Sequence, residues 1–327
     1  MLRTPRALST RLLSPLLRSV GVLLGLAMTA GAICAQTSVI AVDVYNKKIH
    51  LEAGGNTKRP VGGLAKVATA LVALDWADVT KVPLNTLATV SPADLQIAGG
   101  NSLGMAPGDQ VTLRDLIYAS MMSSDNVAST TLANFVGTDI NMRRGKGRDG
   151  IATFVEEMNK LAAREGMKKT RFTNPHGFEN TRNTPYSTAA DLARLSMYAI
   201  SRAPFRFYTN QKSRSITVLR GGAPLSVPLQ NTNALLGQGT IDGIKTGNTP
   251  QSGGCVIVTE ERPGTVMKDP ATGAGVVYRH RMVAIVLGSA DPFAEAQAVL
   301  QQGWAGYDQW LQQGRPVEDA RQLLGSF

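Results

Sequence analysis

Three short segments, far apart in the chain, carry residue types suited to chemistry at a carbonyl group. They are Pro60–Lys66, Ser124–Asn126 and Lys245–Gly247. Residues i and i+3 on a helix are neighbours, roughly 5–6 Å apart at Cβ, so a serine at that spacing before Lys66 could pass its proton to the lysine amine. The start of a helix also favours developing negative charge, because its N–H groups are free. The pattern is therefore typical of acyl transfer, but the residue at the serine position is Gly63.

The tripeptides S-D-N and K-T-G, when combined with S-x-x-K, are the signature of penicillin-binding proteins and serine β-lactamases. Each tripeptide is a weak signal alone, and their order, spacing and contexts make the signal much stronger. From about Val39 to Leu311 the chain resembles the D-alanyl-D-alanine carboxypeptidases, which are low-molecular-weight penicillin-binding proteins. Four further stretches carry this resemblance: Asp242–Gly247, Asn174–Gly177, Tyr186–Leu192 and Thr69–Leu74.

The resemblance implies a role for each matching residue. Ser124 would relay protons with Lys66, and Asn126 would hold the amide of the substrate. The segment around Lys245 would be an edge strand to which a peptide adds in extended form. The resemblance implies four substrate-binding residues: Lys245, Thr246, Gly247 and Asn248. Lys245 and Thr246 would bind the terminal carboxylate. The N–H of Asn248 would form an oxyanion hole with the N–H of residue 63.

Gly63 is the departure from the family pattern, because glycine has no side chain that could form an acyl-enzyme. No serine of the chain is followed by lysine at the i+3 position. Ser124 is the alternative nucleophile, although it would attack from a different wall of the cleft, and small displacements can cost about a hundredfold in rate. A tight entry into the helix would explain the glycine, which is tolerated at an N-cap, but would not explain the retained Lys66.

Two main hypotheses for the function therefore stay open. The first is an exported serine-type D-Ala-D-Ala carboxypeptidase that acts on the stem peptides of peptidoglycan. The second is a non-catalytic module that recognises the same D-Ala-terminated peptides and binds β-lactams non-covalently. A β-lactamase is a weaker alternative, because the E-x-x-L-N segment of the deacylating glutamate is absent and Glu156–Asn159 does not match it.

The hydrophobic pattern places strands at the two ends of the chain and helices between them. Together with the resemblance, it predicts an α+β fold of the penicillin-binding protein and serine β-lactamase type. An antiparallel sheet from both chain ends would be flanked by helices, and a helical lobe would complete a cleft between Lys66, Ser124 and Lys245. The expected strands are 38–45, 48–52, 254–260 and 280–289, and the expected helices are 64–76, 113–123, 127–135, 151–165, 188–200 and 291–311.

The first 35 residues read as a secretory signal peptide, with four arginines ahead of the apolar run Val20–Ala32 and cleavage after Ala35. Because this segment holds four arginines and no acid, its removal lowers the formal charge from +10 to +6 (10 − 4). The protein is therefore expected in the periplasm or outside the cell. The expected domain is 36–311, followed by a short tail, 312–327, with no stable C-terminal membrane anchor.

Composition excludes several other classes of protein. Cys255 is the single cysteine after residue 35, and the three histidines are far apart without an H-E-x-x-H motif, so no metal site is expected. No organic cofactor is implied either, because the protein itself would supply the base and the oxyanion hole. The basic glycine-rich segment Asn141–Gly150 reads as a solvated loop, and no nucleic-acid partner is expected.

Overall fold

The large sheet is built from both ends of the chain, as predicted. In the computed structural model, which describes residues 37–179, 183–268 and 273–325, five antiparallel strands lie in the order β2-β1-β11-β10-β9. Strand β1 is wholly buried between β2 and β11, so strands from the two ends of the chain are neighbours. In this order the strands are β2 (Ile49–Ala53), β1 (Ser38–Asp43), β11 (Gly275–Ser289), β10 (Gly253–Lys268) and β9 (Ile241–Thr249).

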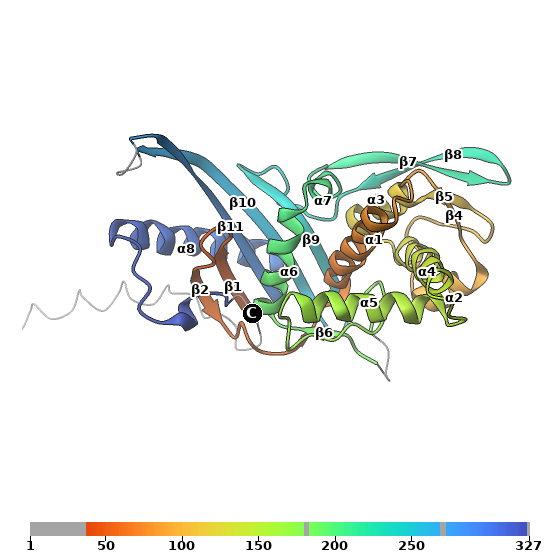
Figure 1. Cartoon of the computed structure of the whole chain (residues 1–327), viewed down its shortest axis with the longest axis horizontal. Helices are drawn as coiled ribbons and strands as arrows, with labels where there is room; N and C mark the ends of the chain where they lie inside the picture. The colour runs from red at the N-terminus through yellow and green to blue at the C-terminus, as the bar shows by residue number, and fades with distance from the viewer. Residues whose placement is uncertain (1–36, 180–182, 269–272, 326–327) are drawn as a thin grey trace, which may run out of the picture. The chain divides into compact units, whose positions relative to one another are not determined.

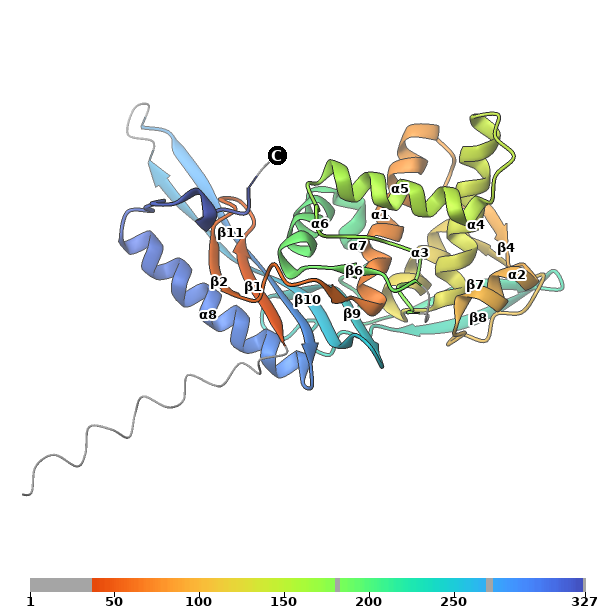
Figure 2. The ribbon, with the colours of Figure 1, turned by 90° about the horizontal axis from the view of Figure 1, so that it is seen from below.

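Helices cover both faces of this sheet (Figures 1 and 2). Helix α8 (Pro292–Gln312) packs on one face through Trp304, Tyr307 and Trp310, all of which are buried. Helix α6 (Ala189–Ser201) lies on the opposite face. The expected helix at 291–311 is confirmed.

The middle of the chain forms the predicted helical lobe. Its central helix is α1 (Lys66–Thr80), which follows a single 3-10 turn, Gly62–Ala65. Two smaller sheets complete the lobe, β3-β6 and β4-β5-β7-β8. The other elements are α2 (Pro92–Ala98), α3 (Leu113–Met122), α4 (Asn126–Arg143), α5 (Gly150–Arg164), α7 (Ala203–Phe207), β3 (Arg59–Pro60), β4 (Leu87–Thr89), β5 (Gln110–Thr112), β6 (Tyr186–Ser187), β7 (Ser213–Arg220) and β8 (Ala223–Gln230).

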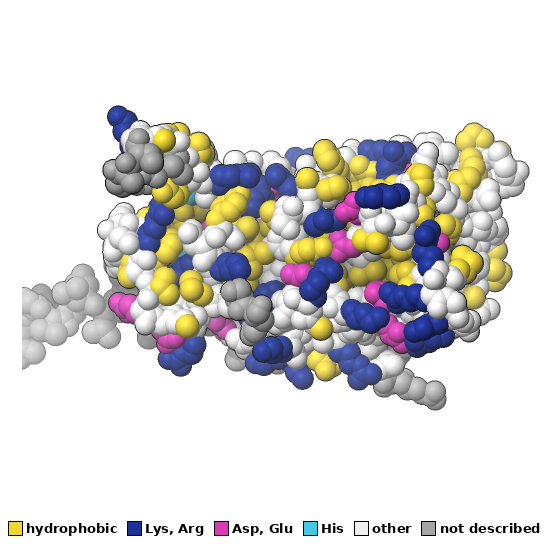
Figure 3. All heavy atoms as spheres, in the orientation of Figure 1, with side chains coloured by type: hydrophobic (Ala, Val, Ile, Leu, Met, Phe, Trp, Pro, Cys, Tyr) yellow, Lys and Arg dark blue, Asp and Glu magenta, His cyan; other side chains and the backbone are white. Residues whose placement is uncertain are grey.

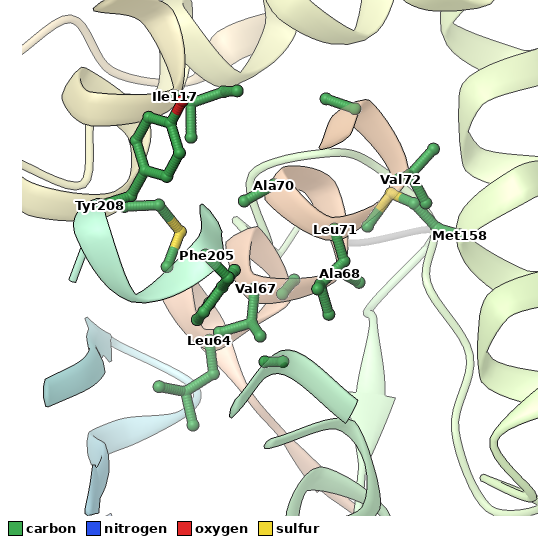
Figure 4. Packing of buried hydrophobic residues seen from close by; sticks show 14 of the residues in the cluster. Leu64, Val67, Ala68, Ala70, Leu71, Val72, Ile117, Met158, Phe205 and Tyr208 are labelled. Carbon is green, nitrogen blue, oxygen red and sulfur yellow. The ribbon is translucent and has the colours of Figure 1, made fainter. Parts of the chain in front are cut away.

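Helix α1 is buried along most of its length, and its apolar side chains fill the centre of the main core (Figure 4). Burying one leucine or valine side chain contributes roughly 1.5–3 kcal/mol, so this packing fixes α1 firmly. The first residue of α1 is Lys66, whose position is therefore set by the core. The labelled core residues are Leu64, Val67, Ala68, Ala70, Leu71, Val72, Ile117, Met158, Phe205 and Tyr208.

Strands β10 and β11 are longer than predicted. The Pro263–Gly264 pair was expected to lie beyond the strand, but the structure accommodates it as a bulge, where the register shifts between Arg262 and Thr265. Because a bulge absorbs residues that cannot join the ladder, pairing resumes after it and extends to Lys268. The two strands continue beyond the helices as a projecting ribbon (Figure 1).

The segment predicted as a basic loop is partly helical. Helix α4 runs on to Arg143 rather than ending near residue 135. Its interior Gly137 allows close packing, since a Cβ there would lie 1.8 Å from the carbonyl oxygen of Gly150 on α5. The exposed Arg144 and Arg148 pair with Glu157 and Glu156 in the middle of α5, so they form a solvated, ion-paired surface.

The predicted signal peptide lies outside the described residues. Residues 36–327 form one compact unit. Among the described residues, no helix combines the length and the apolar character that a membrane crossing requires.

Candidate active site

The entry into α1 is shaped by glycine. The prediction of a regular helix from residue 64 needs correction, because Gly62–Ala65 form a 3-10 turn and the α-helix begins at Lys66. Gly62 has φ +48°, a left-handed conformation that disfavours other residues. A Cβ on it would also lie 2.8 Å from Ser252 Oγ. The tight-entry explanation therefore applies to Gly62.

Gly63 is different, because it has no positive φ that demands glycine. A Cβ at this position would lie 3.0 Å from Ser124 Oγ and 3.0 Å from the carbonyl oxygen of Thr246. The place of the missing side chain is thus where the three sequence segments meet. The structure brings together the residues that the sequence analysis grouped, with no hydroxyl on Gly63.

The loop Ser124–Asn126 is held by its middle residue. Asp125 is buried and caps α4, accepting a hydrogen bond from Ala128 N at 2.7 Å. Its second oxygen accepts hydrogen bonds from Ser102 Oγ at 2.9 Å and from Leu103 N at 3.1 Å. Ser124 has φ +57°, an uncommon conformation for a residue with a side chain. Capping by Asp125 therefore presents its two neighbours to the cleft.

Lys66 lies at the bottom of the site and is only 2% exposed. Its amine donates hydrogen bonds to Asn126 Oδ1 at 2.7 Å and to the carbonyl oxygen of His176 at 2.8 Å. Asn126 Nδ2 in turn donates to the carbonyl oxygen of Ala98 at 2.9 Å. Each end of the Asn126 amide thus has one partner within the protein, and the second N–H and the second lone pair of the oxygen remain for a bound amide.

Strand β9 lies at the edge of the sheet and brings Thr246 and Gly247 to the cleft. A Cβ on Gly247 would lie 2.8 Å from the nitrogen of Gly63, so glycine permits the close approach of β9 to the start of α1. The Thr246 hydroxyl shares a hydrogen bond of 2.6 Å with the hydroxyl of Thr232. Lys245 is 1% exposed and donates to the carbonyl oxygen of Thr246.

These residues surround a cleft of about 420 Å³. Lys245 is not among its lining residues, whereas the sequence analysis expected it to bind the carboxylate directly. Thr232, Phe178 and Phe293 also line the cleft, and they were not predicted because no motif marks them. His176 and Cys255 are both buried and also line the cleft. The lining residues are Gly63, Lys66, Ser124, Asn126, His176, Phe178, Thr232, Thr246, Gly247, Asn248, Thr249, Cys255, Pro292 and Phe293.

The site is short of negative charge. Within the described chain, the amines of Lys66 and Lys245 hydrogen-bond to neutral oxygens, and neither is part of an ion pair. Burial lowers the pKa of Lys66 to about 7, and the charge of Asp125 opposes this shift. Burial, together with the neighbouring Lys66, lowers the pKa of Lys245 well below its ordinary value. Burial and Lys66 also lower the pKa of His176 to about 3. A bound anion would therefore stabilise the charged form of both lysines.

The buried Lys66 gives a testable pH dependence. Its pKa is about 7 in the folded protein, against an ordinary value of 10.5. Between these values the unfolded chain binds more protons, so the contribution of Lys66 to stability rises as the pH rises. From about pH 7 to about pH 9, we expect the unfolding free energy to increase relative to Lys66→Met by on the order of 2 kcal/mol.

Urea denaturation at several pH values measures this difference. Lys81→Met is the control, because that side chain is 80% exposed; its effect on stability should stay constant over the same range. A difference between the unaltered protein and Lys66→Met that does not change with pH would contradict the assignment of Lys66 as a lysine that becomes neutral near pH 7.

Comparison with solved structures identifies the fold. The DD-transpeptidase of Streptomyces K15 matches with a TM-score of 0.70 at 23% identity, over 83% of this chain and 97% of that chain. Penicillin-binding protein D2 from Listeria monocytogenes, in its cefotaxime-bound form, matches with a TM-score of 0.65 at 26% identity, over 83% and 97%. The architecture is that of the penicillin-binding proteins, and the predicted α+β fold class is confirmed.

Sequence comparison identifies the family. The profile of the D-alanyl-D-alanine carboxypeptidase family, peptidase S11, matches residues 27–267, and the chain belongs to this family. The D-alanyl-D-alanine carboxypeptidase DacF of Bacillus subtilis is 24% identical over 256 residues, which are 78% of this chain and 58% of DacF. The D-alanyl-D-alanine endopeptidase of Pseudomonas aeruginosa is 27% identical over 227 residues, 68% of this chain and 66% of the relative. The chain thus spans about two thirds or less of the length of these two relatives.

Proposed function

We propose that this protein recognises D-Ala-terminated stem peptides of peptidoglycan in the cleft without forming an acyl-enzyme. The observation that carries the proposal is Gly63, which stands without a hydroxyl beside Lys66, Ser124 and Thr246. A serine-type carboxypeptidase needs that hydroxyl for its covalent intermediate. Its absence removes the chemical step and leaves the groups that would bind the peptide.

The two buried lysines of the site support the proposal that the ligand ends in a carboxylate. Lys66 and Lys245 are buried without an acidic partner among the described residues, and a terminal carboxylate would supply the negative charge that they lack. Because Lys245 is covered, its contribution would be through its electric field, while Thr246 would contact the carboxylate. The edge position of β9 would let the peptide add as a further strand.

The proposed roles follow the predicted site residues. Lys66, Ser124 and Asn126 would form the remainder of the catalytic group, and their positions around the cleft are compatible with those roles. A β-lactam would occupy the same cleft without a covalent bond; the Listeria relative has been solved with cefotaxime and with ampicillin. The proposed binding residues are Lys245, Thr246, Gly247 and Asn248, with the N–H groups of Gly63 and Asn248 as the oxyanion hole.

The proposed place of action is the cell wall. Family members act on peptidoglycan, which agrees with the signal peptide proposed for residues 1–35. The exported protein would then consist of the domain 36–311 and the tail 312–327, in the periplasm or outside the cell.

A second candidate function is a carboxypeptidase that uses Ser124 as its nucleophile. The Ser124 hydroxyl is 3.0 Å from where a Cβ of residue 63 would lie, so it occupies part of the space of the missing serine side chain. Among the described residues, the hydrogen bonds of Lys66 go to Asn126 and His176 rather than to Ser124. The base is therefore not engaged with this hydroxyl, which favours the binding function.

Binding and turnover can be measured on the same peptide. We expect residues 36–327 to bind a stem peptide ending in D-Ala-D-Ala in calorimetry, to bind the L-Ala-L-Ala peptide more weakly, and to release no D-Ala. Thr246→Val should weaken binding by roughly fivefold through the loss of one hydrogen bond. Thr217→Val, on the exposed side of β7, is the control and should bind like the unaltered protein. Release of D-Ala that Ser124→Ala abolishes would establish the second candidate instead, and the absence of binding would exclude both.

A further inference from the structure

A second groove lies on the face of the large sheet that carries α6. It has a volume of about 800 Å³ and runs between the turn after β1, the helices α6 and α7, and β11. This groove shares no lining residue with the cleft around Lys66. Its chemistry is set by Lys47, Arg206, Arg279 and Arg281, and by the apolar Tyr45 and Phe207.

The groove carries an excess of positive charge. At its floor, Arg281 is 1% exposed and donates from Nη1 to both oxygens of Asp242 at 2.8 Å. Arg206 also pairs with Asp242, and Arg279 pairs with Glu261, which Arg281 contacts as well. Three arginines thus share two carboxylates. Among the described residues, Arg281 Nε is buried without a hydrogen-bond partner, and no acidic side chain lines the groove.

Apolar side chains beside these arginines face solvent. Phe207 is 64% exposed and Tyr45 is 42% exposed. On the projecting ribbon, Val266 and Val277 are directly paired and are 71% and 62% exposed. Residues two apart on a strand point to the same face, so Val277 points to the same side as Arg279. Figure 3 views this face, where hydrophobic and basic side chains lie next to each other between the ribbon and the helices.

We propose that this face binds an anionic phospholipid surface, with a lipid phosphate in the arginine groove and the exposed apolar side chains in the headgroup region. The excess of cationic groups is complementary to a phosphate, and guanidinium groups bind phosphate oxygens in pairs. A soluble anionic polymer would satisfy the arginines but would leave Phe207 and the paired valines exposed. A bilayer satisfies both sets, because apolar side chains enter the interface beside cations that bind headgroups.

Vesicle flotation with residues 36–327 tests the proposal independently of the peptide-binding cleft. We expect binding to vesicles that contain phosphatidylglycerol and little binding to pure phosphatidylcholine. The double variant Arg206→Gln/Arg279→Gln should bind roughly 30-fold more weakly, since each basic residue near an anionic surface contributes on the order of a fivefold change. Phe207→Ser should weaken binding by roughly tenfold.

Matched variants elsewhere on the surface serve as controls. Arg144→Gln/Arg148→Gln removes two exposed arginines of the loop before α5, and Val79→Ser removes an apolar side chain that is 82% exposed. Both should float like the unaltered protein. Equal losses in the two arginine pairs would show attraction by net charge alone and overturn the proposal. It would also be overturned if soluble polyphosphate bound the groove while Phe207→Ser left flotation unchanged, because the ligand would then be a polymer.

Discussion

Gly63→Ser is expected to form a covalent adduct with a labelled penicillin at least on the order of 10³-fold faster than the unaltered chain, because it restores the one group that the acylation step lacks. The new hydroxyl would stand at the start of α1, one helical turn from Lys66. With a pKa of about 7, the Lys66 amine is substantially neutral near neutral pH and can accept the serine proton. The acylation rate should therefore rise as the pH rises through about 7 and then level off.

The space available for the new side chain limits the increase in the acylation rate of the Gly63→Ser variant. Its Cβ would lie 3.0 Å from Ser124 Oγ and from the carbonyl oxygen of Thr246, closer than ordinary van der Waals contact. The Ser124 hydroxyl can rotate away, whereas the carbonyl belongs to β9 and must shift by a few tenths of an ångström. Small displacements at a reacting centre cost rate, so the restored site should be slower than one that evolved with serine.

Intact mass spectrometry measures the adduct directly. The control is Lys66→Ala in the Gly63→Ser background, which keeps the hydroxyl and removes the base. An adduct that forms equally well in this control would contradict the assignment of Lys66. An adduct on the unaltered protein would show that another residue is the nucleophile, and peptide mapping would then test Ser124 first.

Gly177→Ala is expected to destabilise the protein by more than about 4 kcal/mol or to prevent folding, which is the range of severe steric conflicts. Gly177 has φ +83°, and a Cβ on it would lie 1.8 Å from the carbonyl oxygen of Gly62. That oxygen belongs to the turn that carries Gly63, so it cannot move without displacing the start of α1. Urea denaturation followed by circular dichroism gives the change in unfolding free energy.

Gly108→Ala is a matched control for this prediction. Gly108 has almost the same backbone angle, φ +86°, but a Cβ there would meet nothing within 4 Å. It should lose only about 1 kcal/mol, the cost of a left-handed conformation for alanine. Similar losses in the two variants would mean that the backbone angle, rather than the contact with Gly62, makes Gly177 necessary.

The grouping of the candidate site could be predicted from the sequence because its residues belong to short motifs. Lys66, Ser124 and Thr246 do border one cleft. Their detailed contacts could not be predicted: Lys245 is covered, and the amide of Asn126 is bonded at both ends. Thr232 was missed because it lies in the loop after β8 and belongs to no motif, and only the folding of this loop brings its hydroxyl to that of Thr246 on β9.

The fold, too, has parts that could be predicted from the sequence and parts that could not. The sheet from both chain ends and the main helices were predicted correctly, because β-branched runs and regular apolar spacing report local structure. The hairpin of β7 and β8 was not predicted, since many of its residues are exposed and its partner β5 lies about a hundred residues earlier. The bulge in β10 was missed because Pro263–Gly264 resembles the end of a strand.

The sequence by itself determined the chemistry that this protein lacks and the groups that it keeps. Whether residue 63 has a hydroxyl is a property of the chain, and no folding can supply one. Tertiary structure alone decided the protonation state of the lysines in the site. Burial of Lys66 and Lys245, which form no ion pair within the described part of the chain, lowers both pKa values and depends on which segments cover them. Desolvation is a property of the packed surroundings, and so it cannot be read from residue types or their spacing.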